Sequence, residues 1–305
     1  MSKQLSLFVG DNPFHGISHL SQQKARERSL DQSQKSAQQQ AARIVERAVE
    51  CGAEGFMFSV DEVTLSIIKQ LQKNPNASKV RLYAIAPYAY EYVRKATQTG
   101  GVSGLAMNLA KEMVFSSNAK VLASNIGGLA RFNLLALLKT YTAYELSRIK
   151  NASSANNNSN VKLEAFMLHE IVTDMALALN METLFRGYID FLESRHIRPG
   201  FETRNFSILV DKFRDWDIDL GKLTLTASFN KVGFQMCPTK QQCEEALKRA
   251  SGAEVIAMSV LAAGYLKPAE AVGYLANLDG LSGAVIGVSG EQQATETFRV
   301  FREGR

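Results

Sequence analysis

Cysteine is scarce in this sequence, and the spacing that a disulfide or zinc framework needs is absent. The three cysteines, Cys51, Cys237 and Cys243, form no CxxC pair, and no signal-like apolar segment precedes them. We therefore expect a cytoplasmic protein without a disulfide framework. Long hydrophobic runs are also absent. None approaches the ~18 residues that a transmembrane helix requires, so no membrane span is predicted.

Charge of one sign is not concentrated anywhere along the chain. The 35 Lys and Arg residues outnumber the 30 Asp and Glu residues, giving a net charge of +5, but they are spread over many segments. This distribution slightly favours a small anionic ligand and does not favour nucleic acid as a partner.

Short apolar runs alternate with amphipathic helical segments, which is typical of parallel βα units. Runs such as EVIAMSVL are almost continuously apolar, as expected for strands buried on both faces. The segment 36–50 places Ala41 and Ile44 on one helical face before Gly52 ends it. Eight such units predict a single (β/α)8 TIM-barrel domain over 1–305. The predicted strands are 4–10, 54–60, 79–87, 161–169, 198–203, 223–229, 254–261 and 282–288.

Three segments depart from the simple alternation. The segment 101–150 predicts two or three extra helices inserted after the third unit, and its apolar residues offer a surface through which the chain could form a homo-oligomer. The tract NASSANNNSN, 151–160, is almost wholly polar and predicts a flexible loop. Residues 18–36 are equally polar and predict a solvated loop, with a lid as the alternative.

Polar side chains follow most of the predicted strands. In a TIM barrel the active site lies at the carboxyl ends of the strands, so the residues that follow them are the candidates. We expect this rim to collect Asp11, Asn12, His15, Ser59, Asp61, Glu62, Tyr88, Tyr90, His169, Glu170, Asp174, Glu202, Arg204, Asn205, Asn230 and Lys231.

Glycines follow the last two strands. Gly264 lies in LAAGYLKP after the seventh strand, and Gly287, Ser289 and Gly290 lie in GVSGEQQ before the last helix. The N–H groups at a helix N-terminus bind phosphate, and in TIM barrels this site follows strands seven and eight. We therefore predict a small phosphorylated molecule or a nucleotide as ligand. The alternative is that the glycines only make tight turns and Ser289 is a plain N-cap.

The pieces SVLAAGYL and IGVSGEQQATETF resemble the cofactor-binding end of the aldo/keto reductases, a resemblance that covers the C-terminal half of the chain. It implies NADP as cofactor, and a TIM-barrel oxidoreductase. FMLHE resembles the family's fourth strand, so His169 would face the reacting carbon. GFETRNF resembles its fifth strand, so Asn205 would contact the nicotinamide amide. The other implied cofactor contacts are Ser259, Leu261, Gly264, Gly287, Ser289 and Gly290.

The N-terminal half does not match that family's pattern. The family's catalytic Asp, Tyr and Lys have no counterparts in GFMFSVDEV and LYAIAPYAYEY, so carbonyl reduction would need an atypical active site. Tyr88 or Tyr90 would be the replacement proton donor. For the remaining rim groups, the catalytic candidates beside His169 are Glu170, Asp11 and His15, and the substrate-binding candidates are Asn12, Glu202, Arg204 and Asn230.

Three other functions stay open from the residues alone. A desolvated Lys231 at the rim would form a Schiff base with a phosphorylated sugar-like ketone, with His169 or Glu170 as proton shuttle. A divalent metal could be held by Asp11, His15, His169 and either Glu170 or Glu202, although no HxH or HExxH spacing supports it. A non-catalytic barrel would use the segment 101–150 to bind a partner subunit.

Overall fold

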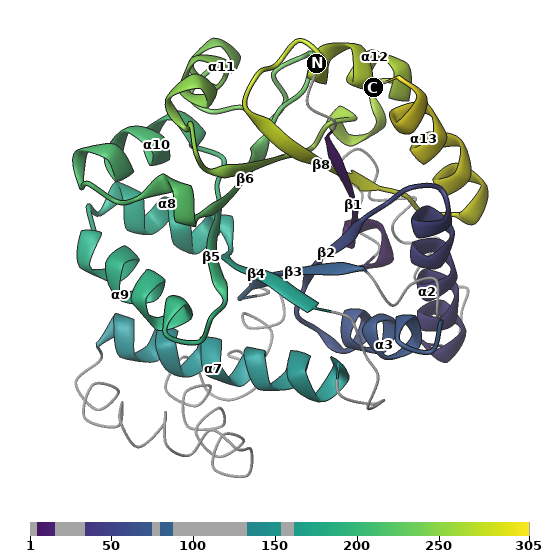
Figure 1. Cartoon of the computed structure of the whole chain (residues 1–305), viewed down its shortest axis with the longest axis horizontal. Helices are drawn as coiled ribbons and strands as arrows, with labels where there is room; N and C mark the ends of the chain where they lie inside the picture. The colour runs from purple at the N-terminus through teal and green to yellow at the C-terminus, as the bar shows by residue number, and fades with distance from the viewer. Residues whose placement is uncertain (1–4, 16–33, 75–79, 88–132, 154–161, 305) are drawn as a thin grey trace.

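The computed structural model describes residues 5–15, 34–74, 80–87, 133–153 and 162–304, and its centre is a closed parallel β-barrel (Figure 1). Each strand pairs with the next along the chain, and β8 pairs with β1 to close the ring. The predicted TIM-barrel fold is confirmed. The strands are β1 Ser6–Gly10, β2 Gly55–Ser59, β3 Arg81–Ala86, β4 Lys162–Leu168, β5 Arg198–Glu202, β6 Thr224–Ser228, β7 Glu254–Met258 and β8 Leu281–Gly287.

Helices surround the barrel on its outside (Figure 1). Within the described ranges, no helix combines the length and the apolar character needed to cross a membrane. The α-helices are α2 Gln34–Glu50, α3 Glu62–Leu71, α7 Leu134–Ser153, α8 Glu170–Ala178, α9 Glu182–Glu193, α10 Phe206–Asp215, α11 Lys240–Arg249, α12 Pro268–Leu275 and α13 Glu291–Glu303. Short 3₁₀ helices are η1 Asn12–His15, η2 Leu220–Lys222 and η3 Ala262–Gly264.

All eight predicted strands are present, and most of their ends agree to within two residues. The seventh differs most, because the prediction 254–261 runs three residues past the observed end at Met258. Ser259 has a left-handed backbone with φ of 53°, which a strand cannot contain. The apolar run therefore continues into a loop rather than along the strand.

The described part of the predicted insertion is the third helix of the barrel itself. α7 lies between β3 and β4 in the chain and packs between α3 and α9 in the outer ring. Its Leu138 and Tyr141 are buried in the main core, whereas Leu134 is exposed. The helix also takes in residues 151–153 of the predicted polar loop, with Ala152 buried. Residues 101–132 and 154–160 lie outside the described residues, as does most of the loop 18–36.

Two apolar cores stabilise the fold. The larger lies between strands and helices, and the smaller fills the barrel with Phe8, Met57, Tyr83 and neighbouring side chains. Phe8 fits because β2 and β8 have glycines beside it. A Cβ at Gly55 would come within 2.6 Å of the Phe8 ring, and one at Gly283 within 2.5 Å. The interior is therefore packed, so the open end of the barrel is the place for a ligand.

Candidate active site

A layer of polar side chains covers the apolar interior at the carboxyl ends of the strands. Side chains alternate along a strand, and Phe58, Phe201 and Ala227 belong to the outer core. Their neighbours Ser59, Glu202 and Ser228 therefore point toward the barrel axis. His169 follows the inward Met167 by two residues, and its backbone N–H still donates to Ala86 O at 2.9 Å, so it points the same way.

The β1 side of this mouth is built around His15. Its Nε2 lies 3.1 Å from Asp11 Oδ2, and its Nδ1 lies 3.0 Å from Asp61 Oδ2. Asp11 also accepts the Ser59 N–H at 2.6 Å, and Asp61 caps α3 by accepting the Thr64 N–H at 2.9 Å. The imidazole is 6% exposed, so the cluster lies almost entirely within the protein. Burial raises the pKa of Asp61, and the charge of His15 partly offsets this.

The β4 side of the mouth presents His169. Its Nδ1 accepts the Ile171 N–H at 3.2 Å, because the residue is the N-cap of α8. A ring nitrogen that accepts cannot carry a proton, so the neutral ring has its N–H at Nε2. Burial lowers the pKa of His169, which favours this neutral form. His169 is therefore arranged as a hydrogen-bond donor rather than as a cation.

Two acidic side chains fix the loop after β5. Glu170 accepts from Arg204 Nε at 2.8 Å, and this hydrogen bond raises the pKa of Arg204. Asp174 accepts from the Thr203 hydroxyl, from the Arg204 N–H at 3.2 Å and from Asn205 Nδ2 at 3.0 Å. The predicted candidates Glu170, Arg204 and Asn205 thus lie together, and Asp174 holds them in place.

The pKa of Glu202 is strongly raised by its surroundings. Burial above the apolar interior, together with the charge of Glu170, raises the pKa of its carboxyl to about 8. Oε2 accepts the Glu170 N–H at 3.3 Å. On the neighbouring strand, the buried hydroxyls of Thr226 and Ser228 have no hydrogen-bond partner within the described ranges. Such groups normally bond to water or to a ligand, so this part of the mouth is suited to polar atoms.

The β7 and β8 side is built from backbone rather than from charged side chains. The N-cap residue of α13 is Gly290, which provides no side-chain cap, so the first N–H groups of the helix stay available. A Cβ at Gly290 or at Gly264 would meet nothing within 4 Å. Ser289 donates from N–H and hydroxyl to Gln293 Oε1 at 2.9 and 3.0 Å and is not the N-cap, so the prediction that it caps the helix was wrong.

The loop after β7 is strained as well as open. Ser259, Ala262 and Ala263 have φ of 53°, 45° and 58°, where side chains are disfavoured, and Gly264 follows at 92°. Leu261 begins η3 and packs partly against the core. Runs of such residues occur where a loop is shaped for a ligand. The predicted cofactor residues therefore lie in or after two neighbouring strands, β7 and β8, apart from Asn205 on the β5 side.

The structure also places the predicted substrate residues Asn230 and Asn12 and the predicted nucleophile Lys231. The Asn230 amide accepts the Phe234 N–H and donates to Phe234 O, both at 2.8 Å, so it closes its own loop. Asn12 lies exposed in η1. The Lys231 side chain is 56% exposed and pairs with Glu270 at 3.3 Å. The Schiff-base hypothesis required a desolvated lysine, and this position contradicts that requirement.

The predicted metal ligands do not converge. Over the described ranges, no group of three His, Cys, Asp or Glu side chains is placed to hold an ion. His15 is instead occupied by Asp11 and Asp61. Tyr88 and Tyr90, the suggested replacement proton donors, lie outside the described residues.

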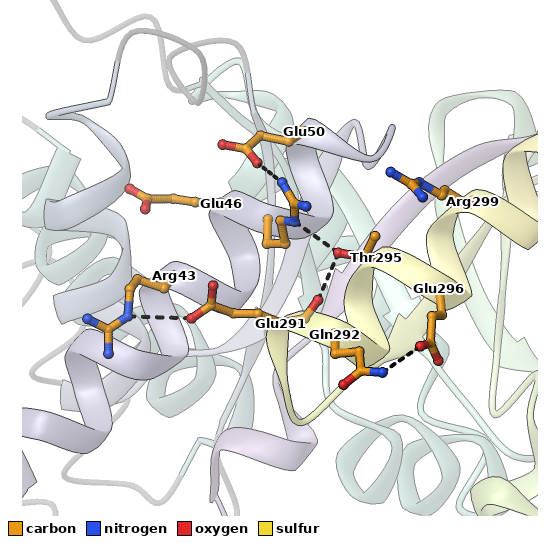
Figure 2. A pocket seen from close by; sticks show the side chains of 9 residues that line it. Arg43, Glu46, Glu50, Glu291, Gln292, Thr295, Glu296 and Arg299 are labelled. Atoms are coloured by element: carbon orange, nitrogen blue, oxygen red, sulfur yellow. Dashed lines mark hydrogen bonds and ion pairs between the residues drawn. The ribbon is translucent and has the colours of Figure 1, made fainter.

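A charged groove of about 640 Å³ lies away from the mouth, between α2 and α13. Arg43 reaches Glu291 at 3.6 Å, and Arg47 donates to Thr295 Oγ1 at 2.9 Å (Figure 2). These contacts join the first and last helices of the outer ring. Its walls carry both signs of charge and few apolar atoms, so we assign the groove to the closure of the barrel rather than to a site.

Sequence reasoning missed several partners in this mouth. It placed Asp61 and Asp174 on the rim without their contacts, and it overlooked Thr226 and Ser228. Polar residues at alternate positions of the buried strand TLTAS were an available signal for the last two.

Comparison with known proteins supports the fold. No protein-family model matches the chain, and no curated protein matches it. Among solved structures, an aldo-keto reductase of Bacillus halodurans, AKR11C1 in its holo form, superposes with a TM-score of 0.56 at 10% identity, over 97% of this chain and 86% of its own. PA4992 of Pseudomonas aeruginosa, assigned to the same family, gives 0.55 at 10% identity, over 98% and 90%. The glycerol dehydrogenase AKR11B4 of Gluconobacter oxydans gives 0.51 at 12% identity, over 97% and 86%.

The resemblance to the aldo-keto reductases is therefore confirmed for the fold, at a remote level and over nearly the whole chain. The earlier match was limited to the C-terminal half, because only there do the residues follow the family's pattern.

Proposed function

We propose that this protein is an oxidoreductase that binds NADP at the backbone surface of β7 and β8 and acts on a carbonyl group at the barrel mouth. The observation that carries the proposal is the uncapped start of α13 beside open space at Gly290 and Gly264. Uncapped N–H groups at a helix start bind phosphate oxygens. The fold shared with aldo-keto reductases, one of them in holo form, supports the same ligand class.

The residues at this surface fit a dinucleotide. Gly290 and Gly264 leave room for a pyrophosphate, which needs donors and space but no specific side chain. The Glu291 carboxylate faces Arg43 on the outer flank, so it does not fill the cradle (Figure 2). Asn205 gives one amide hydrogen to Asp174, and its carbonyl oxygen stays available for a nicotinamide carboxamide. A bound reduced nicotinamide would supply a hydride.

The side chains of the mouth would orient and polarise the substrate. His169 Nε2–H would donate to the carbonyl oxygen, since Nδ1 is already occupied by the Ile171 N–H. Developing negative charge on that oxygen strengthens the hydrogen bond in the transition state. Glu170 and Arg204 form a paired wall beside it, and the Ser228 hydroxyl offers a further polar contact.

Substitution of Gly290 tests the cofactor site without harming the helix. The backbone there is extended, with φ of −158°, so other residues fit, and Asp and Asn are both good N-caps. We expect Gly290→Asp to weaken NADPH binding at least tenfold, because its carboxylate repels phosphate, while the helix gains a cap. Gly290→Asn is the matched neutral control. Thermal shift on adding NADPH measures both. Equal NADPH shifts in the two variants would place the phosphate elsewhere.

A Schiff-base lyase remains the second chemical class, and the exposure of Lys231 counts against it. Borohydride trapping with dihydroxyacetone phosphate would label Lys231 only under that function.

A further inference from the structure

In the cluster of Asp11, His15 and Asp61, each imidazole nitrogen of His15 lies close to a carboxylate oxygen. Both imidazole nitrogens lie within 3.1 Å of a carboxylate oxygen. A neutral imidazole has one N–H, and an ionised carboxylate has none. Both contacts are hydrogen bonds only if one additional proton is present, either on the ring or on a carboxyl. The geometry is therefore suited to hold one additional proton.

The cluster of Asp11, His15 and Asp61 lies next to the mouth of the barrel. Asp11 Oδ2 is used by His15 and by the Ser59 N–H, whereas Oδ1 accepts no hydrogen bond from any residue that the structure describes. The negative charge of Asp11 raises the pKa values of both His169 and Glu202, although burial outweighs it at His169. Asp11 thus stands within electrostatic reach of both groups across the barrel end.

The cluster also has the rigidity that proton transfer requires. Asp61 is held by the Thr64 N–H at 2.9 Å, and Asp11 by the Ser59 N–H at 2.6 Å. Each carboxylate keeps its own backbone donor, so the imidazole has two fixed partners. Glu62, the neighbouring acid on α3, is exposed and pairs with Arg148 at 2.8 Å, outside the cluster.

We propose that Asp11, His15 and Asp61 form a proton relay that supplies the mouth of the barrel, in place of a tyrosine and lysine pair. This inference rests on the proposed function. The carbonyl carbon gains a hydride and the two-electron reductant, a reduced nicotinamide nucleotide, is oxidised. The carbonyl oxygen takes a proton from the Asp11 carboxyl. His15 returns a proton to Asp11, and Asp61 and solvent restore the proton on His15. Asp11 is the catalytic residue, and His15 and Asp61 position and recharge it.

The first test measures the protonation of the His15 ring directly and does not depend on enzyme activity. We expect ¹⁵N NMR of the ring to show protons on both nitrogens of His15 at pH 7, with the exposed His196 as a reference in the same spectrum. Asp61→Asn keeps an N-cap for α3, and its amide can donate to Nδ1, so the variant satisfies a neutral ring. In that variant His15 should lose one proton. A wild-type His15 with a single ring proton at pH 7 overturns the relay.

The second test uses NADPH oxidation with methylglyoxal between pH 6 and 9. We expect wild-type turnover to change with pH in this range as the relay titrates. His15→Gln should lower turnover about 100-fold and remove this pH dependence, because the variant lacks the proton donor. The NADPH thermal shift should stay at its wild-type value. His196→Gln is the matched control and should leave turnover unchanged. Wild-type turnover in His15→Gln contradicts the relay.

A variant of Glu202, which faces the relay across the mouth, distinguishes the relay from another proton donor. Glu202 and His169 titrate there, with Glu170 and Arg204 beside them. If Glu202→Gln abolishes the pH dependence of turnover and His15→Gln keeps it, Glu202 is the proton donor and the relay is wrong. A wild-type protein that shows no NADPH shift refutes the proposed function, and the ring-proton measurement still decides whether the cluster stores a proton.

Discussion

The two sides of the barrel mouth are built in opposite ways. At β1 and β2, three ionisable side chains with little solvent exposure contact one another. At β7 and β8, the surface is made of backbone and glycine, and added Cβ atoms at Gly264 and Gly290 would meet nothing. Buried charges are costly to keep, and so is a left-handed backbone. We propose that the two costs serve different purposes, with one side handling protons and the other accommodating phosphate.

This contrast explains why the two sides tolerate substitution differently. A surface of backbone donors keeps its N–H groups whatever the neighbouring side chains are, so its chemistry depends on space. A cluster of side chains depends on each member, since removing one leaves its partners unsatisfied.

The largest effect is expected at His169, which lies between the two sides. His169→Ala should reduce turnover by roughly 100-fold or more, because the polarising donor is lost. Folding should persist, since the residue is half-buried and only caps α8. Steady-state kinetics with NADPH and circular dichroism measure the two quantities. An Ala variant as active as the wild type would remove His169 from the site.

The next effect separates the two sides by stability. Asp11→Ala should lower the free energy of unfolding by about 1–3 kcal/mol, because it leaves the Ser59 N–H unsatisfied and removes one carboxylate partner of His15. Ser289→Ala at the β8 side should cost less than about 0.5 kcal/mol, because its hydrogen bond to Gln293 is exposed. Urea denaturation of both variants compares them. Equal losses would remove the distinction between the two sides.

A pH effect should follow from Glu202. Its folded-state pKa of about 8 exceeds the ordinary 4.5, so the folded protein holds this proton where the unfolded chain has released it. The contribution of Glu202 to stability is therefore complete below about pH 4.5 and is lost as pH rises to about 8. Glu202→Gln should make the protein more stable by at least about 1 kcal/mol at pH 8 and change little at pH 4. Unfolding curves at the two pH values test this. If the stability difference between Glu202→Gln and the wild type is the same at both pH values, Glu202 is ionised in the folded protein.

The smallest effect is expected at Lys231. Its exposed pair with Glu270 should contribute less than about 1 kcal/mol, so Lys231→Ala should leave stability and NADPH-dependent turnover almost unchanged. A large loss of turnover would instead revive the Schiff-base function.

The sequence predicted the barrel because its strands are short, apolar and regularly spaced, and that pattern depends on local residues alone. It also predicted the rim, since strand ends converge in this fold. It did not predict that His15 lies between Asp11 and Asp61, because that contact depends on how two loops pack. The left-handed residues Ser259, Ala262 and Ala263 were hidden inside an apolar segment that resembles a strand. The third barrel helix was taken for an insertion, because a long segment separates it from β3.

The central claim is that nucleotide binds where the mouth is made of backbone. The most direct measurement is a titration of NADPH followed by amide NMR. We predict that the N–H signals of Gly264, Gly290 and Glu291 shift as the nucleotide binds, while that of Gly221, at the opposite end of the barrel, does not. Shifts confined to other parts of the chain, or no shifts at all, would contradict the account.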